Sequence, residues 1–158
     1  PSHRKDYLRS GINLIQANIN NIQINEAKEV IPMIDIQYTI ETEQYGNKTG
    51  NRLFIPANIF RKGFTTPDLK QRVQDIHINY GYLDTDSICL QIPEGYTIES
   101  LPKTCQVTSS FGSFSSSLII HRLLMHRGIY PKEIYKDFLE FRKQIAAQYS
   151  SKIILKKE

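Results

Sequence analysis

The chain has 158 residues, a net charge of +4 and an isoelectric point near 9.0, with 40% apolar residues, nine Tyr, seven Phe and no Trp. This composition excludes an intrinsically disordered chain, and a chain of this length can fold without a metal ion or a disulfide scaffold. No run of about 18 apolar residues is present, which excludes a membrane-spanning helix. The basic residues gather at the two ends rather than in one patch, which argues against nucleic acid as a partner.

We expect a single domain over residues 1–158, since this length is typical of one domain. The chain starts at Pro1 rather than Met, so we expect a processed product or a fragment of a larger protein, and the missing signal peptide gives no information about the compartment.

The opening residues show helical periodicity. Tyr7, Leu8, Ile12 and Ile15 recur at steps of three and four, which predicts a helix over about residues 4–18. A strand is the alternative, but its alternation breaks at Ile15.

Strict alternation of apolar and polar residues predicts a strand from Met33 to Thr42. Ile34, Ile36 and Ile40 share one side of it, which is typical of an antiparallel strand with one buried face. Similar reasoning predicts shorter strands at residues 22–24, 51–55, 74–80, 88–92, 96–101, 103–110, 115–125 and 152–157, with turn regions at 46–50, 81–86, 93–95 and 111–112.

The best helix of the chain is predicted over about residues 131–149. Pro131 suits the first helical position, and Glu133 in the first turn is favourable against the helix dipole. An apolar stripe follows at steps of three and four, formed by Ile134, Phe138, Phe141, Ile145 and Tyr149.

These elements predict a mainly β (α+β) fold. We expect an antiparallel β-sandwich or a strongly curved sheet, with an N-terminal helix and a C-terminal amphipathic helix packed on it. Ile88, Leu90 and Ile92 are expected to line the core beneath that second helix.

Neither cysteine carries a nucleophile's signature. A reactive thiol needs a helix N-terminus or a nearby cation, together with a His in reach. Cys89 and Cys105 are both predicted within strands, where they are structural thiols or the two halves of a disulfide.

The other titratable residues do not form a metal or glycosidase motif. His121 and His126 are five apart, so on a strand they face opposite ways and do not share one metal ion. Glu94 and Asp86 lie in predicted turns. No catalytic, cofactor-binding or metal-binding residue is therefore assigned, and no cofactor is expected.

Two groups of residues expected on the surface have both a structural and a functional interpretation. The serines from Ser109 to Ser117 lack a Gly-x-Ser-x-Gly motif and fit the polar face of a hairpin. Tyr80, Tyr82 and Tyr96 are ordinary strand residues, or a platform on which a sugar can stack.

An ordered set of short motifs resembles a known family. It resembles the uncharacterised domain found C-terminal to transglutaminase-like domains in envelope proteins of Gram-negative bacteria, and the resemblance is expected to span the whole chain. The residues that carry it are Asn51 to Pro56, Ile92 to Tyr96, Glu99, Leu101-Pro102, Phe111-Gly112, Arg122, Gly128 to Pro131, Tyr135 to Phe141 and Lys152 to Lys156.

The resemblance implies an accessory β-sandwich with a periplasmic or otherwise extracytoplasmic location and no assigned activity. The Cys–His–Asp triad of the neighbouring domain has no counterpart here, since neither Cys is predicted to begin a helix. We therefore expect a non-catalytic interaction domain whose partner is a transglutaminase-like domain or another envelope protein. A glycan-binding module is the alternative.

Overall fold

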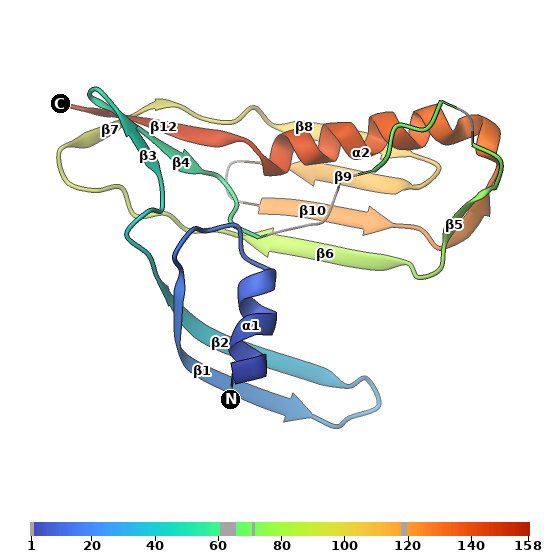
Figure 1. The fold of residues 1–158 in the computed structure, drawn as a ribbon, viewed down its shortest axis with the longest axis horizontal. Coiled ribbons are helices and arrows are strands. Elements are labelled where there is room, and N and C mark those ends of the chain that lie inside the picture. Colours follow the sequence, from blue (N-terminus) through green and yellow to red (C-terminus); the bar gives the residue numbers. More distant parts are fainter. Residues whose placement is uncertain (1, 61–65, 71, 118–119) are drawn as a thin grey trace. The chain divides into compact units, whose positions relative to one another are not determined.

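The computed structural model describes residues 2–60, 66–70, 72–117 and 120–158. Its elements are mostly antiparallel strands, with a short helix near the N-terminus and a longer one near the C-terminus (Figure 1), which confirms the predicted fold class. The contacts group the chain into two compact units. The first comprises 1–47 and 59–61, and the second comprises 48–58 and 62–158. That the whole chain is one domain stays a prediction.

In the first unit, α1 (Ser2–Ser10) is much shorter than the helix predicted over residues 4–18. Tight i→i+3 bonds end it, because the Gly11 amide donates to the Leu8 carbonyl and the Ile12 amide donates to that of Arg9, both at 3.1 Å. Ile12 then forms a bridge with Phe60 rather than another helical turn. The predicted stripe therefore does not form one buried helical face.

The rest of the first unit is a hairpin of β1 (Asn18–Ala27) and β2 (Met33–Glu41). Ile19 lies opposite Ile40 and Ile24 lies opposite Ile36, so these four side chains share one face of the ribbon. Ile19 and Ile24 are five apart, and an unbroken strand would place them on opposite faces. The register shift between Asn20 and Gln23 reverses the alternation of side chains, which brings Ile24 to the same face as Ile19.

The second unit holds a four-stranded antiparallel sheet that is covered on one face by α2 (Tyr135–Tyr149), which a 3₁₀ turn, Lys132–Ile134, precedes. Pro131 is the N-cap of the 3₁₀ turn rather than its first residue. Of the predicted apolar stripe, Phe141, Ile145 and Tyr149 are buried, and Ile134 and Phe138 are partly buried against the core. In spatial order the strands are β6 (Tyr82–Ser87), β10 (Ile120–Met125), β9 (Gly112–Ser116) and β8 (Cys105–Ser109).

The main core lies between this sheet and α2. Phe111, Phe114 and Leu123 from the sheet side meet Phe141 and Ile145 from the helix, and all five are almost completely buried. Phe111 is the centre of an aromatic cluster, with ring centroids 4.7 Å from Tyr130 and 5.0 Å from Phe138. Burial of each such side chain contributes about 1.5–3 kcal/mol.

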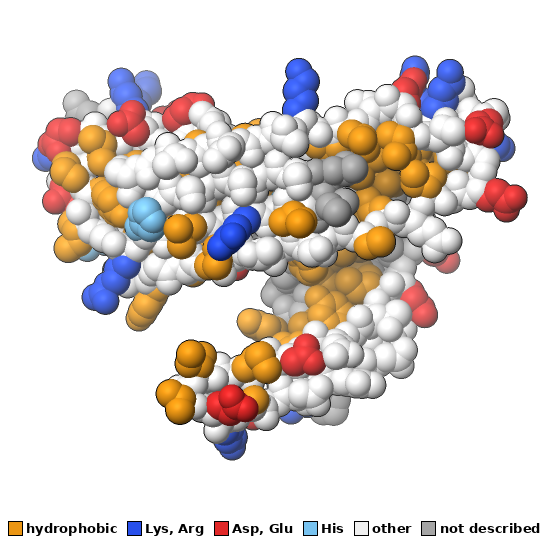
Figure 2. Space-filling view, turned by 180° about the vertical axis from the view of Figure 1, so that it is seen from behind, with side chains coloured by type: hydrophobic (Ala, Val, Ile, Leu, Met, Phe, Trp, Pro, Cys, Tyr) orange, Lys and Arg blue, Asp and Glu red, His pale blue; other side chains and the backbone are white. Residues whose placement is uncertain are grey.

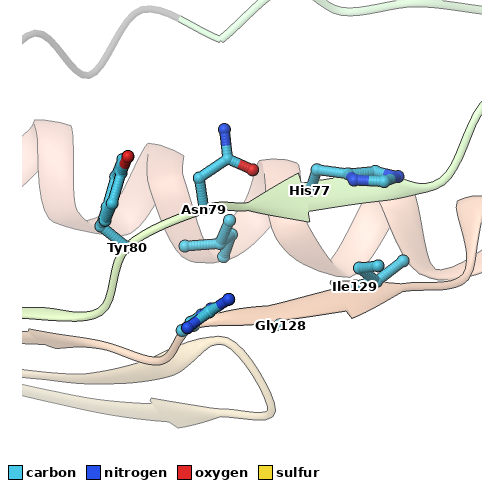
Figure 3. A pocket seen from close by; sticks show the side chains of 7 residues that line it. His77, Asn79, Tyr80, Gly128 and Ile129 are labelled. Atoms are coloured by element: carbon cyan, nitrogen blue, oxygen red, sulfur yellow. The ribbon is translucent and has the colours of Figure 1, made fainter.

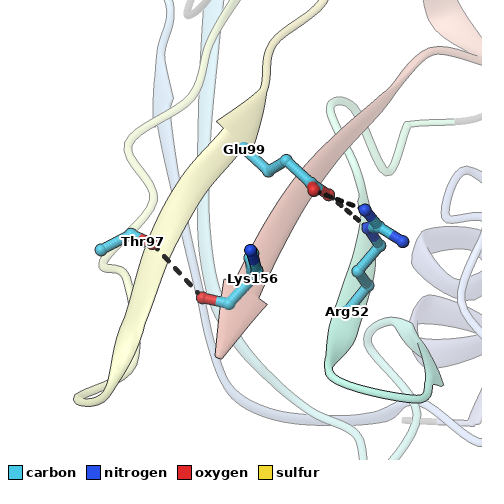
Figure 4. A network of polar contacts seen from close by, with 4 residues as sticks. All are labelled: Arg52, Thr97, Glu99 and Lys156. Atoms are coloured by element: carbon cyan, nitrogen blue, oxygen red, sulfur yellow. Dashed lines mark hydrogen bonds and ion pairs between the residues drawn. The ribbon is translucent and has the colours of Figure 1, made fainter. Parts of the chain in front are cut away.

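A second four-stranded sheet has the order β3-β4-β12-β7. Arg52 on β4 reaches across β12 to Glu99 on β7 and donates to its two carboxylate oxygens at 2.5 and 2.7 Å (Figure 4). A register shift in β7 lies at Glu99, and the hydrogen bond from Arg52 is the main cause that lowers the Glu99 pKa. The strands are β3 (Asn47–Thr49), β4 (Arg52–Pro56), β12 (Lys152–Lys157) and β7 (Tyr96–Ser100).

The last pair of strands is a short ribbon of β5 (Ile76–Ile78) and β11 (Gly128–Tyr130). Ile76 is buried and His77 is exposed, as the alternation predicts. The strand ends before Tyr80, however, so Tyr80 does not share the inward face and is 82% exposed.

Four predicted strand and turn assignments are wrong. Residues 47–49 of the predicted turn 46–50 form β3. Residues 81–86 form most of β6 rather than a turn, because Asp86 faces inward and is held there by polar partners. Residues 88–92 are an extended connection outside the sheets, and Ile92 is 38% exposed instead of lying beneath α2. The predicted strand 115–125 is divided between β9 and β10, where the Ser117 amide donates to the Ile120 carbonyl at 2.9 Å. Within that prediction, residues 118–119 lie outside the described residues, as do 61–65 of the connection after Pro56.

Within the described ranges, no helix has the length and apolar character needed to cross a membrane.

Candidate functional site

Both cysteines are free thiols. Cys89 is exposed on the connection after β6, and Cys105 is half-buried at the start of β8, against the main core. The disulfide that the sequence permits is therefore not formed. Neither residue begins a helix.

The histidines are separated as their spacing predicts. His121 on β10 is 3% exposed on the inner face of the sheet, whereas His126 lies exposed beyond the strand. Over the part of the chain that is described, no three His, Cys, Asp or Glu side chains come together as a potential metal site.

A buried row of polar residues crosses the inner face of the first sheet. Asp86 on β6, His121 on β10 and Ser116 on β9 stand in successive register positions, and all three are at most 9% exposed. Sequence reasoning assigned Asp86 and Ser116 to a turn and to a polar outer face. The three residue types are those of a serine hydrolase triad, so their hydrogen bonds decide what the row can do.

Asn58 and Gln148 each supply a contact to this row. The Asn58 side-chain amide donates to Asp86 Oδ2 at 2.9 Å and contacts His121 Nδ1 at 3.0 Å. An amide NH₂ only donates, so this contact is a hydrogen bond when Nδ1 carries no proton. In a triad the carboxylate instead holds a proton on Nδ1. Ser116 Oγ donates to Gln148 Oε1 at 3.0 Å, so its proton is directed to α2.

Tyr149 of α2 covers this row. Its ring meets that of His121 edge-on, with centroids 5.3 Å apart. Burial is the first cause that raises the Tyr149 pKa, and the negative charges of Asp86 and Asp84 raise it further. The row is therefore a polar network that links the end of α2 to the sheet and to Asn58.

An open pocket of about 370 Å³ lies along the β5–β11 ribbon (Figure 3). His77 and Ile129 are opposite each other in the register, and Asn79, Tyr80 and Arg127 line the same pocket. These five side chains are all exposed. Of the three tyrosines considered as a sugar platform, only Tyr80 lines this pocket, since Tyr82 lies on β6 and Tyr96 is partly buried on β7.

A different kind of surface is found on the β1–β2 hairpin. Its apolar face is covered near Ile19, which is 3% exposed, but becomes open toward the turn. Ile34 is 64% exposed, and in the turn Val30 and Ile31 are 102% and 82% exposed. Figure 2 shows apolar side chains at this end of the hairpin, in the lower part of the view. We call Ile24, Val30, Ile31, Ile34 and Ile36 the hairpin apolar face.

The expected burial of the 33–42 strand is therefore wrong over its first half. The alternation correctly predicts which side chains share a face, but no described element of the first unit covers Ile34. The exposure of this face was missed because a sequence pattern contains no signal for what packs against it.

Comparison with known protein families shows to which of them this chain is similar. A family model described as "Domain of Unknown Function with solved-structure structure (DUF3858)" matches residues 51–155. The match covers nearly all of the second unit, and it does not include α1 or the hairpin, although we expected the resemblance to span the whole chain. No curated protein and no solved structure gives a significant match.

Proposed function

We propose, on the premise that this chain belongs to the DUF3858 family of domains of unknown function, that it is a non-catalytic interaction domain. In this proposal it works outside the cytoplasm, beside a transglutaminase-like domain of a Gram-negative envelope protein. The observation that carries the proposal is the hairpin apolar face.

The hairpin apolar face is costly to leave in water. A two-stranded hairpin is marginally stable by itself, and it usually needs a third strand or a packed layer. Covering a large aliphatic side chain contributes about 1.5–3 kcal/mol when the burial is complete. Ile34, Ile36 and the residues of the turn together therefore offer enough binding energy for a specific partner.

The charge of the hairpin identifies the chemistry of that partner. The hairpin, residues 18–41, contains four carboxylates and one Lys, a net charge of −3, although the whole chain carries +4. A contact between the hairpins of two copies would bring like negative charges together, and an anionic lipid surface would repel the hairpin. The partner that fits is a protein surface with an apolar patch surrounded by Lys and Arg, which we assign to the neighbouring transglutaminase-like domain.

The proposal is tested on the full-length parent protein by hydrogen exchange. Backbone amides of β1 and β2 should exchange more slowly in the full-length protein than in residues 1–158 alone. Isothermal titration of the separate transglutaminase-like domain with residues 1–158 should show binding that Ile36→Lys weakens at least tenfold. Gln37→Lys is the matched control, because it adds the same charge on the opposite face of β2.

Two results would contradict the proposal. Equal exchange of the hairpin amides in the two proteins would show that the neighbouring domain does not cover it. An equal loss of binding for Ile36→Lys and Gln37→Lys would show that charge, and not the hairpin apolar face, governs the contact.

A glycan-binding module is the second candidate function. It is favoured by one observation, the exposed ring of Tyr80 beside the polar side chains of the β5–β11 pocket. Aromatic rings with a free face and adjacent hydrogen-bonding groups suit the apolar faces and hydroxyls of sugars.

A further inference from the structure

The β5–β11 pocket brings together residues that are about fifty positions apart in the sequence. The register places His77 opposite Ile129, and Asn79 and Arg127 lie just outside the two strands. His77 on β5 and Asn79, which follows the end of that strand, both line the pocket (Figure 3). Tyr80 follows directly, at the end of the ribbon.

The charge of this pocket is unbalanced. Arg127 makes no hydrogen bond or ion pair with another residue of the described ranges, and none of the residues that line the pocket carries a carboxylate. A guanidinium presents a planar fork of donors that matches a carboxylate in two parallel hydrogen bonds. The pocket is therefore suited to an anionic group.

The other side chains that line the pocket indicate the size and polarity of the uncharged part of the ligand. Tyr80 and Ile129 are 82% and 66% exposed, and they offer an aromatic and an aliphatic surface. The Asn79 amide both donates and accepts, as does a neutral His77 ring, which suits neighbouring hydroxyls. A volume of about 370 Å³ is at the small end of ligand sites and fits one or two sugar rings.

We propose that the β5–β11 pocket binds a saccharide whose pyranose ring carries a carboxylate. Tyr80 stacks on the ring, Asn79 and His77 bind its hydroxyls, and Arg127 pairs with the carboxylate. This inference rests on the second candidate function, and it adds the acidic class of the sugar and the residue that selects it. It is independent of the hairpin apolar face.

The test compares tri-galacturonic acid with its methyl ester, which has the same rings without the negative charge. Titration of residues 1–158 in 150 mM NaCl, followed by NMR, should show at least tenfold tighter binding of the acid. Arg127→Gln should remove that difference, and Tyr80→Ala should weaken the binding of both ligands. Arg122→Gln is the control, because it removes an exposed arginine of β10 that does not line this pocket.

Each other outcome has a definite meaning. If acid and ester bind equally tightly, the glycan candidate stands and the selection by Arg127 is wrong. If neither ligand binds, and an array of acidic and neutral glycans also retains no protein, both the candidate and this inference are wrong. If Arg122→Gln weakens binding as much as Arg127→Gln, the attraction is a general effect of positive charge and the pocket is not the site.

Discussion

The β1–β2 hairpin and the β6-β10-β9-β8 sheet are built on the same alternation of side chains, but only the sheet has its apolar face covered. Phe114 and Leu123 are at most 1% exposed beneath α2, whereas Ile34 is 64% exposed on the hairpin. Alternation thus predicts which residues share a face, and burial depends on a second element that lies far away in the chain. A face left open in this way is a candidate for a partner.

The largest effect on stability is expected when Ile is replaced by Ala in the covered core, and the same substitution on the exposed hairpin serves as the comparison. Ile145→Ala opens a cavity under the sheet, where Ile145 is 0% exposed, and should lower the free energy of unfolding by about 2–5 kcal/mol. Ile34→Ala should cost about 1 kcal/mol or less, through β propensity alone. Urea titrations followed by circular dichroism measure both. Equal losses would mean that Ile34 is buried in solution.

The covered sheet should also be intolerant of a single added methyl group. Gly112 has φ +149°, and a Cβ built there would lie 1.9 Å from the Leu124 carbonyl oxygen. Gly112→Ala should therefore cost about 2–4 kcal/mol in thermal or urea unfolding. Gly95→Ala is the control, because Gly95 also has a positive φ, +75°, but has open space around its Cβ position. That variant should lose about 1 kcal/mol. Equal losses would show that conformational strain, and not the clash, determines the effect.

The polar row defines how α2 is held on the sheet. Asn58→Ala removes the amide that donates to Asp86 and to His121 Nδ1, and should destabilise the protein by about 1 kcal/mol. The imidazole resonances of His121 in NMR spectra should shift as its Nδ1 contact is lost. An unchanged His121 spectrum would contradict the assigned hydrogen bond, whatever the change in stability.

The smallest effect is expected at alkaline pH. Burial and the nearby carboxylates raise the Tyr149 pKa above its ordinary value of 10.0, so folding favours the protonated phenol. The contribution of this group to stability is complete below pH 10 and is lost as the pH rises above it. Tyr149→Phe should therefore lose less stability than the unmodified protein between pH 9 and pH 11. Parallel pH profiles would contradict the raised pKa.

The sequence predicts correctly those parts of the fold that depend on the periodicity of neighbouring residues. The closing helix and the shared face of Ile34, Ile36 and Ile40 follow from periodicity alone. In β6 the pattern is inverted, because Asp86 points inward and Leu83 is 53% exposed. Asn58, which donates a hydrogen bond to the buried Asp86 carboxylate, is 28 residues away in the chain. The sequence around Asp86 therefore gives no indication of this partner.

The candidate sites were predictable only in part. Exposed Tyr80 was considered as a sugar platform from its type alone, but Arg127 and His77 entered no hypothesis about that platform. Their meeting depends on the pairing of β5 with β11, and β11 is only three residues long. Such a short strand carries too few alternations to be recognised, so the cation of the pocket could not be assigned to it.

The position of β12 has a consequence for how the protein is made. This strand lies between β4 and β7, and it pairs Ile153 with Ile55 although these residues are far apart in the chain. During synthesis, β4 and β7 leave the ribosome before the strand that joins them, each with unpaired backbone groups along an edge. The second sheet can therefore close only after translation has passed β12, and until then the facing edges of β4 and β7 stay unpaired.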